Sequence, residues 1–541
     1  MKRISLLIAA LLCVGVADAQ IRLGDGQLSG SVESNSIVYV NDKGLSSLAP
    51  EDHFGSNNYV KVDYTYKRLS AGIQAEAYLP ALQGYEIGEQ DPGYNVYLAS
   101  KYIQWQDKNF SVLAGDIFDQ YGNGLIFRSF EDRQLGFNNS IEGLRAAYNF
   151  GRYVSLKAMY GRPRLYGHYA GSWVRGGDVS VSLSDIIFGD NNPKGVLLTL
   201  EGSYVNRYEK LTKDENINFG DRGLTTPNLD MFSGRVNLDV AGFALRGEYV
   251  HKGKDLITPV ANEATDGQAI YAELGYSYKS FSFSAMGRML DNMGTVLSLY
   301  GSGTGNTLNY LPALTRQYTY MLANLNPYQV NNEGEVGAQA DVYYSYRSKS
   351  NRYRYWNFHL NFSTYYTLHK SQTRSGKHEL LWRDINFDVE RQWNKSLKTS
   401  FLYSMQTWNP YHGSVAETCT SNIFVVDVQY KFDRKKSLRA EVQYLLGGNK
   451  EGWKYGQDEG HWIAGLVEFN LAPSWSFYVS DMYNMGLTKK NYYNAGFSYT
   501  HKRTRVQLSY GRNRAGYICS GGVCRYSPEY TGVNLALTSS F

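Results

Sequence analysis

Histidines and clustered cysteines are the side chains that most readily carry acid–base or metal chemistry. The nine histidines of this 541-residue chain are scattered, and neither an HExxH motif nor a zinc-type cysteine pair occurs. His359 and His461 fall in predicted strands, where contact with water explains His359 more simply than catalysis. A Ser/His or Asp/His site needs a neighbour for the histidine that sequence alone does not reveal. We therefore predict no enzyme, no catalytic, cofactor-binding or metal-binding residues, and no cofactor.

Two stretches mix apolar, aromatic and charged residues: Gly115–Arg145 and Asn309–Gly337. They are unlike solvated loops rich in Ser and Gly, so each must pack on something. The charged residues could pair with one another or with a surrounding wall. Two interpretations stay open. The stretches could form a constriction of a pore or a docking face for a partner, or they could form an inward lid that only seals the barrel. The candidate constriction residues are Arg128, Glu131, Asp132, Arg133, Arg316 and Tyr318.

Cysteine is rare in the chain. Cys519 and Cys524 are separated by four residues, a spacing that a hairpin tip can bridge. Because residues 1–19 have the pattern of a signal peptide, described below, the chain is expected to enter an oxidising compartment, and we predict a disulfide between them. Cys419 is left over and is interpreted as an unpaired loop thiol.

In the elements that must position these residues, apolar and polar side chains alternate with a period of two residues. In 424–432, Val426, Val428, Tyr430 and Phe432 alternate with the polar residues Asp427, Gln429 and Lys431, and the same pattern recurs along the chain. At about 22 residues per repeat it gives 24 candidate strands. They are 28–40, 58–68, 70–79, 94–105, 109–117, 139–149, 152–162, 172–184, 195–206, 229–240, 242–251, 267–278, 280–290, 335–346, 355–368, 379–391, 396–409, 421–432, 436–446, 459–470, 474–485, 490–500, 503–513 and 527–541.

The connections alternate between short and long. Every second one is generally a tight turn, whereas the others are usually longer, including 41–57, 118–138, 207–228, 291–334, 410–420 and 514–526. This parity is typical of an outer-membrane barrel with short periplasmic turns and long extracellular loops. We predict an all-β fold, a transmembrane antiparallel β-barrel of about 24 strands, with 26 as the alternative if Leu125–Phe130 joins the wall.

A soluble all-β solenoid or sandwich would show the same alternation. Two features favour the barrel. Phe541 ends the chain on the same face as Leu537, like the terminal insertion signal of bacterial outer-membrane proteins. Aromatics also cluster near strand ends, as interfacial girdles require; examples are Tyr343, Tyr344, Tyr346, Tyr353, Tyr355, Trp356, Tyr365 and Tyr366.

Residues 1–19 are predicted to be a signal peptide. Lys2 and Arg3 precede an apolar stretch, and 17–19 (Ala-Asp-Ala) forms a small-x-small cleavage site. The barrel domain is then 20–541, with long extracellular loops and no separate plug domain, since the strand pattern begins at Leu28. Barrels with 22 strands need a plug. We therefore expect 118–138 and 291–334 to fold into or over the lumen.

Composition limits the partners. Charged residues make up 19% of the chain and the net charge is +5, which gives no indication of a nucleic-acid partner. The expected partners are outer-membrane lipids, with envelope proteins possible at the periplasmic turns or the extracellular loops. The basic turn residues Arg434, Lys435 and Lys436 would face anionic headgroups or such a protein.

The stretches Gly115–Arg145 and Asn309–Gly337 also resemble the signature segments of an uncharacterised family of Gram-negative outer-membrane barrels, a domain of unknown function. The resemblance covers the whole mature chain. It implies a location in the cell envelope, but no activity and no site residues. We predict a porin-like channel or transporter for solutes, with inward-folded loops, in the cell outer membrane. The alternative is a non-enzymatic barrel subunit or scaffold of an outer-membrane assembly or export complex.

Overall fold

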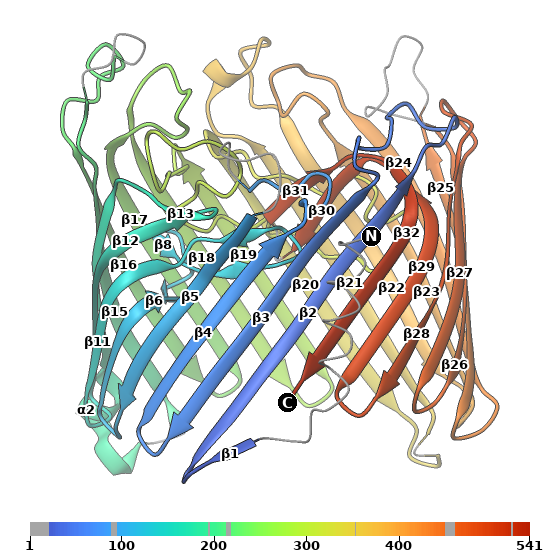
Figure 1. Cartoon of the computed structure of the whole chain (residues 1–541), viewed down its shortest axis with the longest axis horizontal. Helices are drawn as coiled ribbons and strands as arrows, with labels where there is room; N and C mark the ends of the chain where they lie inside the picture. The colour runs from blue at the N-terminus through green and yellow to red at the C-terminus, as the bar shows by residue number, and fades with distance from the viewer. Residues whose placement is uncertain are drawn as a thin grey trace.

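The computed structural model describes residues 21–87, 95–192, 195–212, 218–351, 353–448, 460–520 and 523–541. Its long strands form one antiparallel sheet that closes into a barrel (Figure 1). They are β2 (Gly26–Val40), β3 (Phe54–Tyr66), β4 (Leu69–Tyr78), β5 (Asn95–Gln106), β6 (Phe110–Ile117), β11 (Ile141–Phe150), β12 (Val154–Leu165), β14 (Trp173–Ser182), β15 (Leu197–Tyr208), β16 (Asn228–Val240), β17 (Phe243–Asp255), β18 (Thr265–Tyr278), β19 (Phe281–Asp291), β20 (Gly334–Arg347), β21 (Tyr355–Thr367), β22 (Leu380–Gln392), β23 (Leu397–Trp408), β24 (Cys419–Lys431), β25 (Lys436–Gly447), β26 (Trp462–Leu471), β27 (Trp475–Asn484), β28 (Asn491–His501), β29 (Thr504–Asn513) and β32 (Tyr530–Ser540).

The first and last long strands close the barrel. β2 pairs with β32 from Ser31↔Ser540 to Val40↔Thr531, and it pairs with β3 on its other side. Two short strands, β1 (Ile21–Leu23) and β13 (His168–Tyr169), only extend the sheet beside β2 and β12. Closure satisfies the backbone groups that a free edge would expose. The predicted barrel of 24 antiparallel strands is confirmed.

The alternative with 26 wall strands is wrong. Within Leu125–Phe130, β8 (Phe127–Arg128) pairs with β7 (Gln120–Tyr121) in a separate small sheet. β6 pairs directly with β11, so the wall has no place for an inserted hairpin. The apolar side chains Leu125, Ile126 and Phe127 are at most 2% exposed inside the barrel, where they are more favourably buried than in the wall.

Alternation along each strand separates the two faces of the wall. In β24, Phe424 and Val426 point outward and are exposed, whereas Ile423, Val425 and Asp427 between them are buried. The strand therefore presents an apolar outer face, as predicted, but its inner face carries both apolar and charged residues. This mixed inner face is what the loops pack against.

The two rims differ. Short turns such as 67–68 and 502–503 join strands at the lower rim of Figure 1, and the C-terminus lies toward the same rim. One lower connection carries a short helix, α2 (Leu183–Phe188), followed by the 3-10 turn η2 (Gly189–Asn191); the periodicity did not predict it. Arg152 from the neighbouring turn pairs with Asp190 at 2.6 Å beside this helix. In the described residues, no helix is both long and apolar enough to cross a membrane.

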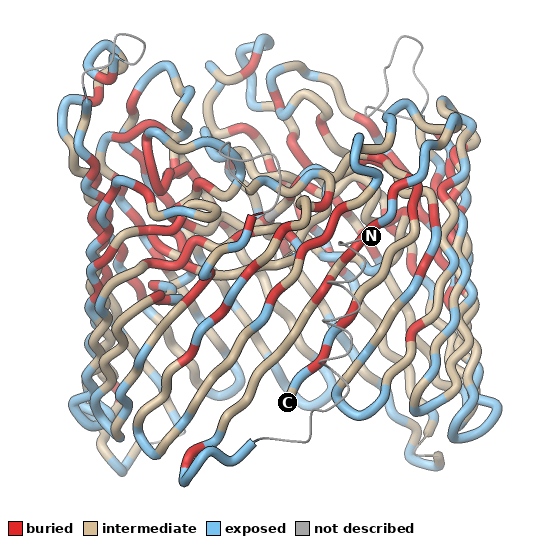
Figure 2. Tube along the Cα trace, in the orientation of Figure 1, coloured by how far each residue is buried: buried red, intermediate tan, exposed pale blue. Residues whose placement is uncertain are grey.

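The buried core lies inside the upper half of the barrel, on the long-loop side (Figure 2). The largest apolar cluster joins inner-face residues of β6 to β19, such as Met231 and Val250, to Tyr121 and Phe127 from 118–138 and to Leu297 from 291–334. A second cluster joins Leu322 and neighbouring residues of 291–334 to the inner faces of β23 to β28. The upper half of the barrel interior is thus filled by the protein's own loops.

Candidate functional site: the loops inside the lumen

Segment 118–138 leaves the wall after β6 and folds into two small hairpins. The first is formed by β7 and β8, and the second by β9 (Glu131–Asp132) and β10 (Phe137–Asn138). Gly122, at φ +53°, lies so close to the wall that a Cβ there would meet the Arg235 side chain at 2.6 Å. The next residue, Asn123, donates its side-chain NH₂ to Glu248 of β17 at 2.8 Å. The first hairpin is therefore held directly against the inner wall.

Arg133 ties the second hairpin to the opposite part of the wall. Its guanidinium donates to Glu33 of β2 at 2.8 Å, to Glu131 at 3.0 Å and to Gln74 of β4 at 3.2 Å. Gln74 also donates to Glu131 at 2.5 Å, and the Arg133 guanidinium lies 4.7 Å from the Tyr59 ring centre. Arg133 and Glu131 are thus two predicted site residues that the fold brings together with wall charges.

Arg128 and Asp132 have local roles. The Arg128 guanidinium lies over the rings of Phe130 and Tyr310, at 4.4 and 3.8 Å from their centres. The Asp132 carboxylate accepts the backbone N–H groups of Gln134 and Leu135 at 2.9 and 3.0 Å. Arg128 therefore links the two lumen segments, whereas Asp132 shapes a turn within one of them.

The two lumen segments are hydrogen-bonded to each other. Asn309 donates to the carbonyls of Leu125 and Met293 at 3.0 and 2.7 Å, and the Tyr310 N–H donates to the Gly124 carbonyl at 2.9 Å. Since Asn309 is buried, these bonds are protected from water. We call 118–138 and 291–334 together the double lid.

The second half of 291–334 reaches the strands on the other side of the barrel. Arg316 forms an ion pair with Asp388 and donates to Asn386 at 2.6 Å, both on β22. The Tyr318 hydroxyl donates to Asp384 of the same strand at 2.6 Å. Arg316 and Tyr318, which the sequence singled out, therefore anchor this part of the lid to one wall strand.

Sequence reasoning missed three arginines of the wall. They donate to loop carbonyls or pair with an acidic residue on another wall strand. Arg207 donates to the Val296 carbonyl at 2.7 Å and pairs with Asp255 at 2.8 Å. Arg288 donates to the Pro312 carbonyl at 2.5 Å and pairs with Glu335 at 2.8 Å. Arg164 pairs with Glu76 at 3.0 Å, and all three side chains are at most 3% exposed. Their inward strand position was the available signal, but only the folded loops supply the carbonyl acceptors.

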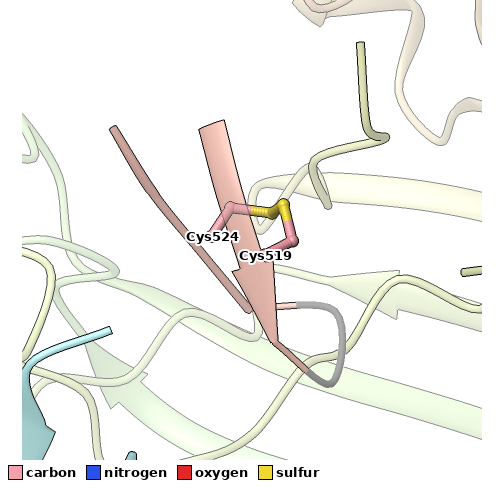
Figure 3. The surroundings of a disulfide bond; sticks show 2 residues. All are labelled: Cys519 and Cys524. Carbon is pink, nitrogen blue, oxygen red and sulfur yellow. A yellow bond between two sulfur atoms is a disulfide. The ribbon is translucent and has the colours of Figure 1, made fainter. Parts of the chain in front are cut away.

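A third segment also turns inward. β30 (Gly516–Ser520) and β31 (Val523–Ser527) form a hairpin in which Cys519 pairs with Cys524 through a disulfide (Figure 3). Arg525 of this hairpin donates to the Gly84 carbonyl at 2.8 Å and lies 4.0 Å from the Tyr85 ring centre. The sequence indicated a hairpin but not that it bends back into contact with another loop.

The sequence profile of a family of unknown function, DUF6029, matches residues 1–541. The chain belongs to this family. The predicted membership of an uncharacterised family is therefore confirmed, and the family brings no activity with it. No curated protein matches the chain in sequence.

Solved structures share the barrel architecture at low identity. The P pilus usher (PapC) translocation pore is 10% identical, with a TM-score of 0.44 over 95% of this chain and 99% of that one. The siderophore receptor PirA from Pseudomonas aeruginosa is 9% identical, with a TM-score of 0.40 over 96% and 81%. OpdL from Pseudomonas aeruginosa is 11% identical, with a TM-score of 0.36 over 80% and 100%. This likeness concerns the fold alone.

The histidine that sequence placed on the inner wall lies in a polar cluster. His359 of β21 is 2.8 Å from Asp341 through Nε2 and 3.1 Å from Asp388 through Nδ1. Asp388 is also the partner of Arg316, so the cluster continues into the double lid. His461, the other strand-region histidine, lies just before β26 and is exposed. Across the described ranges, no three His, Cys, Asp or Glu side chains are arranged to hold a metal ion.

Proposed function

We propose that the chain is an outer-membrane barrel. The observation that supports this is the outer face, where large apolar side chains are exposed on strand after strand, as hydrocarbon contact requires. Examples from around the barrel are Ile73, Leu144, Leu200, Leu245, Ile270, Leu360, Val426, Val442 and Val479. Phe541 suits the role of insertion signal, since its backbone pairs with Gly30 at 2.9 and 3.1 Å at the barrel seam.

We further propose a solute channel or transporter, without enzymatic activity, whose extracellular half is constricted by the double lid. The supporting observation is that the double lid contacts strands from β2 to β25 by hydrogen bonds and ion pairs. In this proposal the loops replace a separate plug domain, which a barrel of this width would otherwise need. The candidate constriction residues act as anchors: Arg133 and Arg316 fix the loops that narrow the path.

A second function, a scaffold subunit of an envelope assembly or export complex, is favoured by a different observation. The double lid is fixed by buried ion pairs and an apolar core rather than by weak surface contacts. A permanent seal would serve a protein that holds partners and passes no solute.

Planar-bilayer conductance of the purified protein separates the two. We expect small channels from the wild type, and larger ones when 310–328 is replaced by a short Gly/Ser linker. Cells with this variant should also become more sensitive to large antibiotics. The control replaces the exposed stretch 374–377 by Gly/Ser of equal length, which should change neither readout. Unchanged permeability of the 310–328 variant, together with loss of a co-purifying partner, would favour the scaffold.

A further inference from the structure

A pocket of about 360 Å³ lies on the long-loop side, between three segments that are distant in sequence. One wall comes from 325–329 of the double lid with the upper ends of β22 and β23, and another from the disulfide hairpin. The loop 409–412 completes it. Its volume falls within the ~300–1,000 Å³ typical of small-molecule sites. Nothing in the lid anchoring described above uses this space.

The first wall has a rigid aromatic backing, in which Tyr328 and Trp382 line the pocket and are 7% and 3% exposed. The Tyr328 ring stacks on Tyr365 with centres 5.0 Å apart and 20° between planes, and lies 5.8 Å from the Trp382 ring. The Tyr328 hydroxyl donates to Glu335 at 2.5 Å, and the Trp382 indole N–H donates to Ser363 at 3.3 Å. These bonds fix the ring orientations, so the surface is formed before any ligand arrives.

The facing wall presents exposed aromatics. Tyr517 and Tyr526 are direct cross-strand partners in the hairpin, with ring centres 5.5 Å apart and planes at 74°. They are 41% and 51% exposed, although they line the pocket. The disulfide joins the same two strands two residues from each tyrosine, which limits the motion of this wall.

The polar groups of the pocket are mostly neutral. Asn326 and Gln329 flank Tyr328, and neither side chain hydrogen-bonds to another residue of the described chain. Arg514 is the permanently charged side chain of the lining, and no carboxylate is among the described residues that form it. Flat aromatic surfaces bordered by carboxamides suit a ligand with an apolar ring face and a rim of hydroxyl groups.

We propose that this pocket binds a saccharide, as a short neutral or anionic oligosaccharide at the extracellular side. A sugar ring offers C–H groups to an aromatic ring and hydroxyls to the carboxamides and phenols. A purely aromatic ligand would desolvate Asn326 and Gln329 without giving them partners, which is unfavourable. A cationic ligand would meet the like charge of Arg514, which lines the pocket. The site goes beyond the proposed channel, because binding here requires no open path through the lumen.

The test uses the full-length protein purified in detergent and three probes: maltohexaose, cellohexaose and hexagalacturonate. Isothermal titration and quenching of tryptophan fluorescence report binding, since Trp382 and Trp408 line the pocket. We expect at least one probe to bind, and the double variant Tyr517→Ala/Tyr526→Ala to weaken it roughly tenfold, the loss of ~1.4 kcal/mol.

The control is Tyr153→Ala, a tyrosine 44% exposed near the opposite rim, which should bind like the wild type. Heat-modifiable gel mobility checks that each variant is still a folded barrel. A second pair, Asn326→Ala and Gln329→Ala, should also weaken binding without affecting the hairpin. Failure of all three probes at 10 mM, or equal binding by the tyrosine double variant, would overturn the proposal. Neither result depends on conductance, so the channel proposal stands or falls separately.

Discussion

At the scale of single residues, the interior is organised by arginines whose charge is fully enclosed. The side chain of Arg288 is 1% exposed and that of its partner Glu335 is 0% exposed. Glu335 also accepts from Tyr328 at 2.5 Å and from the Asn331 N–H at 2.8 Å. The Glu335 carboxylate therefore binds Arg288 of the wall strand β19 and also two residues of the double lid, Tyr328 and Asn331.

Replacing Arg288 by alanine should destabilise the barrel by about 3–5 kcal/mol, because it leaves Glu335 buried without a counter-charge. Urea unfolding followed by gel mobility measures the change. Arg246→Ala is the matched control: Arg246 pairs with Asp239 at 2.7 Å, but the two side chains are 31% and 39% exposed. A surface pair of this kind contributes only about 0–1 kcal/mol. Equal losses in the two variants would contradict the enclosed-pair account.

Glu209, just beyond β15, gives a pH-dependent prediction. Burial raises the pKa of its carboxyl above the usual 4.5, although Ser298 and the Leu299 N–H each donate to it at 2.6 Å. A raised acid pKa means that the folded state holds the proton longer than the unfolded state. Its contribution to stability is thus complete below pH 4.5 and declines as pH rises through the folded pKa.

The Glu209→Gln variant should lack this decline while keeping one acceptor and one donor at the site. Unfolding free energies of the wild type and the variant, measured from pH 4 to pH 8, should diverge in favour of the variant as pH rises. A constant difference between them would show that the carboxyl titrates normally in the folded state.

At the scale of elements, the disulfide hairpin 516–527 is attached to a neighbouring loop through Arg525. Arg525, 5% exposed, contacts Gly84 and Tyr85, and its cross-strand neighbour Ile518 adjoins Cys519. A crosslink that closes so short a loop contributes about 2 kcal/mol in the chain-entropy model. Without it, the hairpin should open and expose Arg525.

Trypsin cleavage after Arg525 should therefore be slow in the wild type and faster by roughly thirtyfold in Cys519→Ser/Cys524→Ser, as expected for a loss of ~2 kcal/mol in local closure. Peptide mapping measures the rate. Cys419→Ser, which changes a buried cysteine on β24, serves as the control and should leave this cleavage unchanged. Equal rates in the two variants would mean that the Arg525 contacts alone hold the hairpin.

The strands were predictable from sequence, whereas the loop contacts were not. Alternation specifies a strand locally: Phe424 and Val426 share one face and Val425 lies on the other, whatever the rest of the chain does. The partners of Arg133 are instead Glu33 and Gln74, which are 100 and 59 residues away in the sequence. Such pairs depend on barrel closure, which brings β2, β4 and the loop after β6 together, and no local pattern encodes them.

At the scale of the whole molecule, the double lid is one body that is anchored on both sides of the barrel, and Arg133 and Arg316 are its charged anchors at the two ends. Arg133 attaches it to β2 and β4, and Arg316 attaches it to β22. Between these anchors, Asn309 and Tyr310 bond the two segments to each other. Freeing one anchor should therefore have little effect as long as the other holds.

A double-mutant cycle tests whether the two loops form one lid. Arg133→Ala and Arg316→Ala should each raise bilayer conductance slightly, and the double variant should raise it by clearly more than the two single increases combined. The physical reason is that the two segments are joined through Asn309, so that the anchor at one end restrains the other end when its own anchor is lost. The control is a second cycle that combines Arg133→Ala with Arg246→Ala. Arg246 lies near the opposite rim, so the effects of these two substitutions should be additive. Additive increases for Arg133 and Arg316 as well would show that the segments move independently, and the lumen would then be narrowed by two separate loops.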